Sequence, residues 1–421
     1  MKLKTLAIIV SSILPSVGFA DTEENKRFSF YADSTDIVIN KDSTATVRPY
    51  NDDDMVAEVL IENSDRNRVS HNIYDTFNID SDGAILNNKE SNAKFIINEV
   101  KFGPRSTLEG NIAVLGNAAH VIIANPNGIT CNNCSFSNTL SETLATASIQ
   151  YAKDNLITYR TSNFLPSNNM YREKKIDTRN HGEINFIENE KNKNTTNKFS
   201  TLNIISNNID INMYLKAKES INIYHGISLL NYKTNNQKVD ILNNSKGSRL
   251  IGRKIDTNLA IGDKNNIDKS QHLNGIQANK INIHTNVSTV NNYSVIKATK
   301  INLNILNNSK FNNHGVISSN LTTIKLQGNS HFKNKEDSVI AKFRHDDYAY
   351  YRSKDPFIKY ENIYRFKVSA DNSSIFINEG ALKTDKFKTI DGSIHNIITN
   401  NAQLHSYNSL SKIKDNSSVR R

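Results

Sequence analysis

Short segments in which apolar and polar residues alternate recur along the second half of the chain. Residues 276–283 read IQANKINI, and residues 296–303, 20 positions later, read IKATKINL. Residues 317–324 (ISSNLTTI) follow 21 positions further on, with a slip of one residue. An alternation with a period of two is typical of a β-strand that buries one face. We therefore expect strands whose isoleucine and leucine side chains point inward.

These segments form a tandem repeat. Residues 215–223 and 382–387 resemble degenerate copies of it. Each of the three clear copies has a small residue at the same position (Ala278, Ala298 and Ser319). A bulky side chain would not fit a tight corner, so we place these small residues at corners. A strand unit repeated every ~20 residues indicates a β-solenoid, in which each coil rises by ~4.8 Å. A β-sandwich with chance similarity between its strands is the alternative.

The first 20 residues have the pattern of a secretory signal peptide. Lys2 and Lys4 precede an apolar run at 6–17, and residues 18–20 (Gly-Phe-Ala) form a small-x-small cleavage site. The apolar run is short for a membrane-spanning helix. We expect cleavage after Ala20 and folding outside the cytoplasm.

The remaining chain divides into two parts. Residues 29–150 are rich in Ala, Val, Gly and turn signals, whereas residues 151–421 are rich in Asn and Lys. Two irregular insertions interrupt the second part, near 189–198 and near 344–364. We expect an N-terminal domain at 29–150, followed by an Asn-rich β-helical repeat region.

The composition narrows the class of protein. The 421 residues include 64 Asn and 2 Cys, and the mean hydropathy of −0.54 argues against a polytopic membrane protein. Asn is a weak helix former that suits turns and left-handed backbone, and stacked copies can form side-chain amide ladders. The net charge of +10, or +8 without the two lysines of the signal peptide (10 minus 2), is spread along the chain. This diffuse charge does not predict a nucleic-acid partner.

Residues 98–139 are the most informative stretch. Their pattern predicts strands at 96–100, 108–115 and 119–124, with turns between them and an Asn-Pro-Asn-Gly turn at 125–128. Pro126 presets φ for such a turn, and Asn127-Gly128 supplies residues that accept positive φ.

Five ordered motifs resemble the secretion domain of two-partner-secretion exoproteins, the filamentous haemagglutinin/haemolysin family of Gram-negative bacteria. They are S-H-N-x-Y-x-x-F-N at 70–78, G-x-x-L-N-N at 83–88, N-E-V at 98–100, L-x-G-x-I-x-V-x-G at 108–116 and A-N-P-N-G-I-T at 124–130. The resemblance covers about residues 35–150. In one departure from the family pattern, residues 89–94 (KESNAK) replace the usual N-P-N-L-type turn.

The resemblance implies a right-handed parallel β-helix with an N-terminal secretion cap. It also implies recognition by the periplasmic domains of a dedicated outer-membrane β-barrel transporter, in which extended segments of this chain would pair with an exposed sheet edge of the partner. The product would be an extracellular or surface-associated adhesin or haemolysin that contacts a host or neighbouring-cell surface. The residues that would carry secretion competence are Asn72, Asn98, Asn125, Pro126, Asn127 and Gly128.

Cys131 and Cys134 are the two cysteines of the chain. A zinc site would need a second ligand pair, which the neighbouring sequence does not supply. A thioredoxin-like site would need a helix N-terminus, whereas these residues follow a β-turn. A local disulfide is the favoured interpretation, and the pair resembles the haemolysin and contact-dependent-inhibition branches of the family.

We predict no enzyme activity, cofactor or metal. Ser70, His71 and Asp75 suggest a catalytic triad, but adjacent residues on a strand point to opposite faces. Arg344, Asp346 and Asp347 could be read as a lyase cluster and are more simply part of a solvated loop. Two alternatives stay open: a β-helical polysaccharide-degrading enzyme and a short carrier of a contact-dependent toxin.

Overall fold

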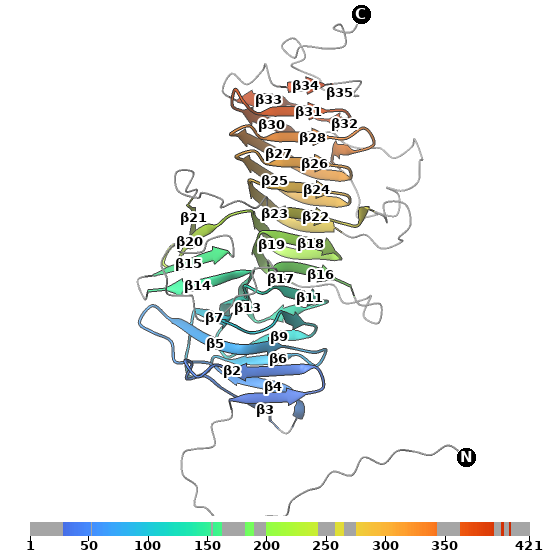
Figure 1. The fold of residues 1–421 in the computed structure, drawn as a ribbon. Helices are drawn as coiled ribbons and strands as arrows, with labels where there is room; N and C mark the ends of the chain where they lie inside the picture. Colours follow the sequence, from blue (N-terminus) through green and yellow to red (C-terminus); the bar gives the residue numbers. More distant parts are fainter. Residues whose placement is uncertain are drawn as a thin grey trace, which may run out of the picture.

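The computed structural model describes ten segments of the chain: 28–51, 53–152, 155–161, 182–188, 199–242, 257–264, 275–342, 363–390, 397–399 and 404–405. The predicted signal peptide and the predicted insertion at 189–198 lie outside these residues, as does the insertion near 344–364 up to residue 362. Most of the described strands stack as rungs of one column, with β3 near one end and β34 and β35 at the other (Figure 1). Within these segments, no helix is long and apolar enough to cross a membrane.

Three sheets form the column, and their members are strands that successive coils contribute in turn. The main sheet contains β1 (Ser29–Ala32), β2 (Thr35–Ile39), β5 (Val69–Asn78), β7 (Phe95–Val100), β10 (Ala119–Ala124), β13 (Thr139–Ala145), β17 (Phe199–Ser206), β19 (Tyr214–His225), β23 (Gly275–Asn286), β25 (Val295–Leu306), β27 (Val316–Gln327), β29 (Val339–Ala341), β30 (Arg365–Ala370), β32 (Ala381–Lys383), β33 (Phe387–Ile390) and β35 (Leu404–His405). The second sheet contains β8 (Ser106–Leu108), β11 (Ile129–Asn132), β16 (Glu183–Ile187), β18 (Asn208–Asn212), β22 (Asn258–Ile261), β24 (Thr289–Asn292), β26 (Lys310–Asn313), β28 (His331–Asn334), β31 (Ile375–Asn378) and β34 (Ile397–Thr399). The third sheet contains β3 (Thr46–Tyr50), β4 (Asp53–Leu60), β6 (Ala84–Asn87), β9 (Asn111–Leu115) and β12 (Ser135–Ser137).

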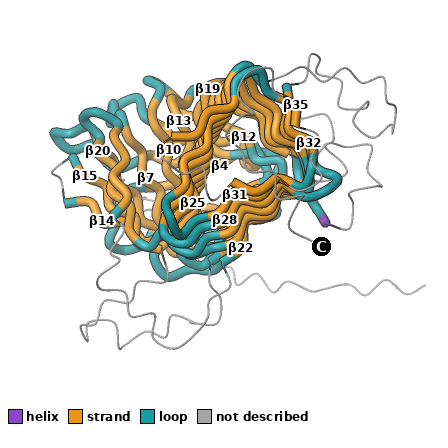
Figure 2. The backbone as a smooth tube through the Cα atoms, turned by 90° about the horizontal axis from the view of Figure 1, so that it is seen from above, coloured by secondary structure: helices purple, strands orange, loops and turns teal. Residues whose placement is uncertain are grey.

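The register between neighbouring coils confirms the repeat read from the sequence. Ile276 pairs with Ile296, which pairs with Ile317, and the pairing is parallel. Ile317 pairs in turn with Ile340, and Ile340 with Leu382. One side chain of each coil therefore stacks directly on its equivalent in the next, and the chain is a parallel β-helix. Viewed along the column, the coils superpose around a shared interior (Figure 2).

The small residues lie where the long strands turn a corner. The pairing of β23 with β25 skips one position directly after Ala278 and Ala298. The same corner divides β27. Its residues before the corner pair with β29, and its residues after the corner pair with β30. The three small side chains are buried. The predicted corner is therefore confirmed.

The interior of the column is a continuous apolar core. Inward isoleucine, leucine and valine side chains of all three sheets belong to it, together with phenylalanines of the later coils. Phe311, Phe332 and Phe376 stack on one another in successive coils, with ring centroids 5.3 and 5.2 Å apart. Because each coil covers the apolar face of its neighbour, stability accumulates along the stack.

One predicted strand is wrong. The expected strand at 108–115 is two strands, β8 and β9, which belong to different sheets. Gly110 lies at the corner between them, and a Cβ atom there would come within 2.4 Å of the backbone oxygen of Asp80 in the preceding coil. The close approach of two backbones requires glycine and ends the first strand.

The sequence pattern did not predict a fourth, antiparallel sheet. This side sheet consists of β14 (Ala147–Tyr151), β15 (Leu156–Thr161), β20 (Leu229–Lys233) and β21 (Lys238–Ile241). It packs on the outer face of the main sheet around a second apolar cluster that includes Phe95, Ile122 and Tyr159. In β7 and β10 every residue is consequently buried. The nearly unbroken apolar runs FII and VIIA were the signal for burial on both faces.

Candidate functional site

The Asn125–Gly128 segment forms a closed turn at the end of β10. The backbone amide of Gly128 donates to the carbonyl oxygen of Asn125, 3.1 Å away, and Asn127 N donates to Asn125 Oδ1 at 2.9 Å. Gly128 has a φ of 117°, which an L side chain rarely adopts. Asn125 is fully buried. Asn125, Asn127 and Gly128 of the motif therefore each have a structural reason at their positions.

The turn is fastened to the coil on either side. Asn127 Nδ2 donates to the carbonyl oxygen of Gly103 at 2.6 Å, and Asn125 Nδ2 donates to that of Pro104 at 2.7 Å. In the following coil, a Cβ atom on Gly182 would come within 2.1 Å of Pro126 O. The turn thus lies in a stack of three backbone segments with no room for extra atoms.

Arg105 clamps the same stack from the outside. Its Nη1 donates to the carbonyl oxygens of Glu183 at 2.9 Å and Ile129 at 3.3 Å. A Cβ atom on Gly128 would meet the guanidinium at 2.6 Å. The guanidinium therefore ties three successive coils together through backbone oxygens. Sequence reasoning missed Arg105, although it directly follows the Gly103-Pro104 turn.

Asn72 and Asn98 lie on the main sheet and point into the core. They pair with each other in the register of β5 and β7, and both are buried. Asn72 Nδ2 donates to Ile97 O at 3.1 Å, and Asn98 Nδ2 donates to Ile122 O at 3.4 Å. The amide of each coil thus donates to the backbone of the next. The structure places these two asparagines on strands, apart from the turn that contains Asn125.

The core-facing amides have further partners that satisfy them. Asn72 Oδ1 accepts from the backbone amide of Glu62 at 2.8 Å, and Asn98 Oδ1 accepts from the Tyr74 hydroxyl at 2.9 Å. Tyr74 is fully buried, and this burial raises the pKa of its hydroxyl well above the ordinary value. The phenol therefore stays protonated and acts as a donor. A buried polar group with partners costs little, whereas an unpaired one costs about 1–3 kcal/mol.

Glu99 of the N-E-V motif links the helix to the side sheet. Its Oε1 accepts from the backbone amide of Ile149 at 2.9 Å, and its Oε2 lies 2.9 Å from His71 Nε2. Because residues alternate along β7, Glu99 points out while Asn98 points in. The alternation of the motif could have revealed this second role.

Ser70, His71 and Asp75 do not converge. Ser70 is buried and its hydroxyl lies 3.4 Å from Asn72 Oδ1, whereas His71 pairs with Glu99 on the opposite face. Asp75 accepts from the side-chain amide of Asn40 at 2.5 Å. The triad geometry is therefore not formed.

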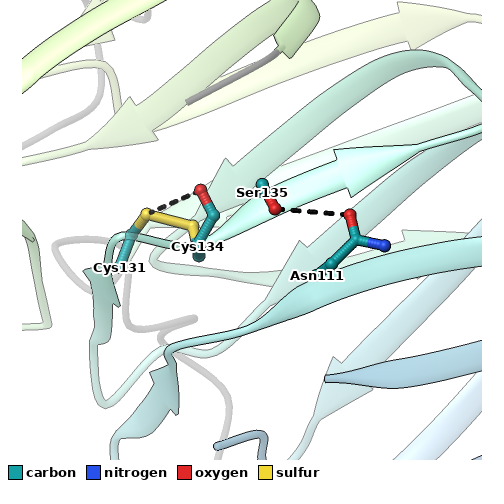
Figure 3. Close-up of a disulfide and its surroundings, with 4 residues drawn as sticks. All are labelled: Asn111, Cys131, Cys134 and Ser135. Carbon is teal, nitrogen blue, oxygen red and sulfur yellow. Dashed lines mark hydrogen bonds between the residues drawn. A yellow bond between two sulfur atoms is a disulfide. The ribbon is translucent and has the colours of Figure 1, made fainter. Parts of the chain in front are cut away.

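Cys131 and Cys134 form a disulfide at the end of β11, and both are fully buried (Figure 3). Ser135, the next residue, donates from its hydroxyl to Asn111 Oδ1 in the preceding coil at 3.3 Å. The bridge closes a loop between the second and third sheets, so it fixes a corner of the coil.

The sequence of this chain is similar to a known protein family and to several named proteins. A family model described as "TPS secretion domain" matches residues 38–345. The "16S rRNA endonuclease CdiA" of Enterobacter cloacae is 40% identical over 112 residues, which are 22% of this chain and 3% of that protein. The "tRNA nuclease CdiA" of Yersinia mollaretii is 45% identical over 98 residues (18% and 3%), and the "Hemolysin" of Serratia marcescens is 34% identical over 108 residues (21% and 7%). The matched segment is thus a small fraction of each relative.

Among solved structures, the filamentous hemagglutinin secretion domain aligns with a TM-score of 0.47 and 14% identity, over 88% of this chain and 99% of that one. The HMW1 secretion domain from Haemophilus influenzae aligns with a TM-score of 0.38 and 14% identity, over 88% and 97%. The family match covers more than half of the chain, including the turn stack and the core-facing asparagines. The chain belongs to the TPS (two-partner secretion) secretion domain family, and it is secreted through the periplasm to the cell exterior or surface.

Proposed function

We propose that a dedicated outer-membrane β-barrel transporter recognises this chain through its first coils, and that the later coils act outside the cell as an adhesin or haemolysin. The observation that carries the first part is the position of the motif residues. Asn72, Asn98, Asn125 and Asn127 all donate from one coil to the backbone of a neighbouring coil. The motif residues therefore join the first coils into one unit that a partner can recognise.

The N-terminal end of the column offers edges for such a partner. β1 and β3 are the terminal strands of the main and third sheets. The large apolar side chains of Phe28, Tyr31 and Met55 are exposed at this end, at 50%, 68% and 37% of their full area. Among the described strands these two edges carry no further strand, and an edge flanked by exposed apolar side chains suits pairing with an edge strand of another protein.

Secretion assays with matched variants test the recognition step. Asn127→Ala removes one amide donated between coils near the motif turn, and Asn312→Ala removes a similar one, from Nδ2 to Asn291 Oδ1 at 3.0 Å, in a late coil. In cells that carry the transporter, we expect Asn127→Ala to reduce the amount in the medium several-fold and Asn312→Ala to leave it unchanged. Normal secretion of a chain that lacks residues 60–140 would contradict the proposal.

Haemolysis and cell-binding assays on the secreted chain test its action outside the cell. The 34% identity to a Serratia marcescens protein named "Hemolysin" supports this part of the proposal. We expect lysis of red cells or saturable binding to a cell surface. A secreted, folded chain with neither activity would rule out both roles.

A second candidate is a short carrier in a contact-dependent toxin system. The relatives named CdiA, at 40% and 45% identity, favour it. A competition assay between producing and non-producing bacteria separates this candidate from the first, because only a toxin carrier reduces the growth of neighbours that lack immunity.

We further propose that the chain acts without catalysis. Glu99 and Arg105, two ionisable residues of the motif region, are engaged in contacts between coils or sheets. Incubation with polyuronates tests this against the β-helical polysaccharide-degrading alternative. Accumulation of unsaturated sugar products would contradict the proposal.

A further inference from the structure

Three aspartates meet where the first hairpin contacts the first coil. Asp33 lies in the two-residue turn between β1 and β2, and Asp80 and Asp82 lie in the turn that follows β5. One carboxylate oxygen from each residue lies within 4.8 Å of the other two. Asp33 and Asp82 are exposed, whereas Asp80 is 5% exposed. The cluster is thus open on one side and has a buried carboxylate at its base.

The buried carboxylate has an unpartnered oxygen. Asp80 Oδ1 accepts from the backbone amide of Asp82 at 3.0 Å, but Oδ2 is buried and has no hydrogen-bond partner among the residues that the structure describes. A buried carboxylate oxygen with no donor is costly, and two further carboxylates beside it add like-charge repulsion. Among the described residues, none of the three aspartates has an ion pair with a basic side chain. No described basic side chain therefore offsets the charge of the three carboxylates through an ion pair.

The backbone holds the cluster in place. Asp80 N donates to Thr35 Oγ1 at 3.1 Å, which joins the turn after β5 to the start of β2. The amide of Gly83 donates to Asp80 O at 3.2 Å and closes the turn. The three carboxylates are consequently presented by two fixed turns from segments more than 40 positions apart in the sequence.

We propose that Asp33, Asp80 and Asp82 bind one Ca²⁺ ion after secretion, which fastens the β1–β2 hairpin to the first coil. A set of carboxylate oxygens suits a hard cation. Bonds of about 2.4 Å from Ca²⁺ span this spacing, and water can fill the remaining positions on the open side. Mg²⁺ demands shorter bonds and near-ideal octahedral geometry. Sites in extracellular modules have a Kd of about 0.1–1 mM, which matches the compartment of a secreted chain.

Calorimetric titration and thermal unfolding of the full secreted chain, first treated with EDTA, test the site. We expect saturable heat of CaCl2 binding with a Kd of about 0.1–1 mM, and a Tm several degrees higher in about 5 mM CaCl2 than in EDTA. Asp33→Asn and Asp82→Asn change exposed residues, so the chain is expected to fold. Each should weaken Ca²⁺ binding at least ~10-fold, because a charged ligand is lost.

Asp42→Asn is the matched control, since Asp42 is an exposed aspartate in the turn that follows β2, outside the cluster. It should bind Ca²⁺ as the unchanged chain does. Asp80→Asn keeps an Oδ1 acceptor for Asp82 N, and we expect it to be at least as stable as the unchanged chain in EDTA but unresponsive to Ca²⁺. Absence of Ca²⁺ binding, an equal response in Asp33→Asn and Asp42→Asn, or an equal response to MgCl2 would overturn the proposal.

Discussion

Asn313 on β26 donates from its side-chain amide to Oδ1 of Asn334 on β28, 2.7 Å away in the next coil, and both side chains are fully buried. Asn292 donates to Asn313 in the same way, and Asn334 donates to Asn378, each at 2.7 Å. The four amides form a buried ladder along the second sheet. Each of the first three amides donates to the next, which lets them lie inside the protein, whereas Nδ2 of Asn378 at the end of the ladder is buried with no hydrogen-bond partner in the described part of the chain.

The first prediction concerns this ladder. Asn313→Ala removes two of its hydrogen bonds and leaves the amide of Asn292 and the carbonyl of Asn334 with fewer partners. We expect the free energy of unfolding to fall by about 1–3 kcal/mol, as measured by urea denaturation. The control is Asn312→Ala, which removes a part-buried amide hydrogen bond on the other face of β26 and should cost less. An equal decrease in the free energy of unfolding for the two variants would show that a buried hydrogen bond of the ladder stabilises the fold no more than the part-buried one.

A second prediction concerns the phenylalanine stack. Phe332 is fully buried between Phe311 and Phe376. Phe332→Ala leaves a cavity in the centre of the stack, so we expect the free energy of unfolding to fall by about 3–5 kcal/mol in the same assay. Phe332→Leu keeps most of the volume and should lose less. A loss below about 1 kcal/mol for the alanine variant would mean that the neighbouring coils collapse into the space.

The repeat region was largely predictable because its geometry is local. Ile276, Ile296 and Ile317 recur at a nearly constant spacing, and the parallel register of a β-helix is the direct consequence of that spacing. The ladders were predictable for the same reason, since equal positions in successive coils carry Asn. Asn also supplies eight of the twelve non-glycine residues with positive φ in the described part of the chain. The expected role of Asn in turns and ladders is therefore confirmed.

The side sheet could not be predicted in this way, because its pairing is antiparallel and connects distant segments. Ile157 pairs with Tyr232, 75 positions later (232 minus 157), and no repeat relates them. The candidate site was predictable only in part. Motifs pointed to Asn125 and its turn, but Arg105 acts through backbone oxygens of coils that are far away in the sequence. Contacts of that kind follow from the assembled coils and leave no local pattern.

A third prediction concerns the disulfide. The Cys131→Ala/Cys134→Ala double variant opens a loop with a sequence separation of 3. Because so short a loop restricts the unfolded chain only slightly, we expect a loss of about 2 kcal/mol in the free energy of unfolding. We also expect secretion to be unchanged, since the bridge lies within one coil. Denaturation with and without a reducing agent checks the first expectation, and the amount in the medium checks the second. Failure of the variant to fold would contradict both.

The fourth prediction concerns Glu142, which is fully buried on β13. Burial raises the pKa of its carboxyl from 4.5 to about 7, although hydrogen bonds from Thr139 and the amide of Ser200 act in the opposite direction. Between pH 4.5 and 7 the folded chain holds this proton and the unfolded chain does not. Its contribution to stability is therefore full below pH 4.5 and is lost as the pH rises to 7, by about 3 kcal/mol in total.

Glu142→Gln keeps an oxygen acceptor but does not titrate. The free energy of unfolding of the variant, relative to that of the unchanged chain, should increase by about 3 kcal/mol as the pH rises from 4.5 to 7.5. Urea denaturation of both proteins at intervals of pH measures this difference. Burial lowers the pKa of His120, His225 and His284 to about 4, which makes stability rise with pH between 4 and 6.5. Because both proteins contain these histidines, their contribution cancels in the difference between the two curves. A difference that does not change with pH would mean that the Glu142 carboxyl is already ionised in the folded chain at pH 5.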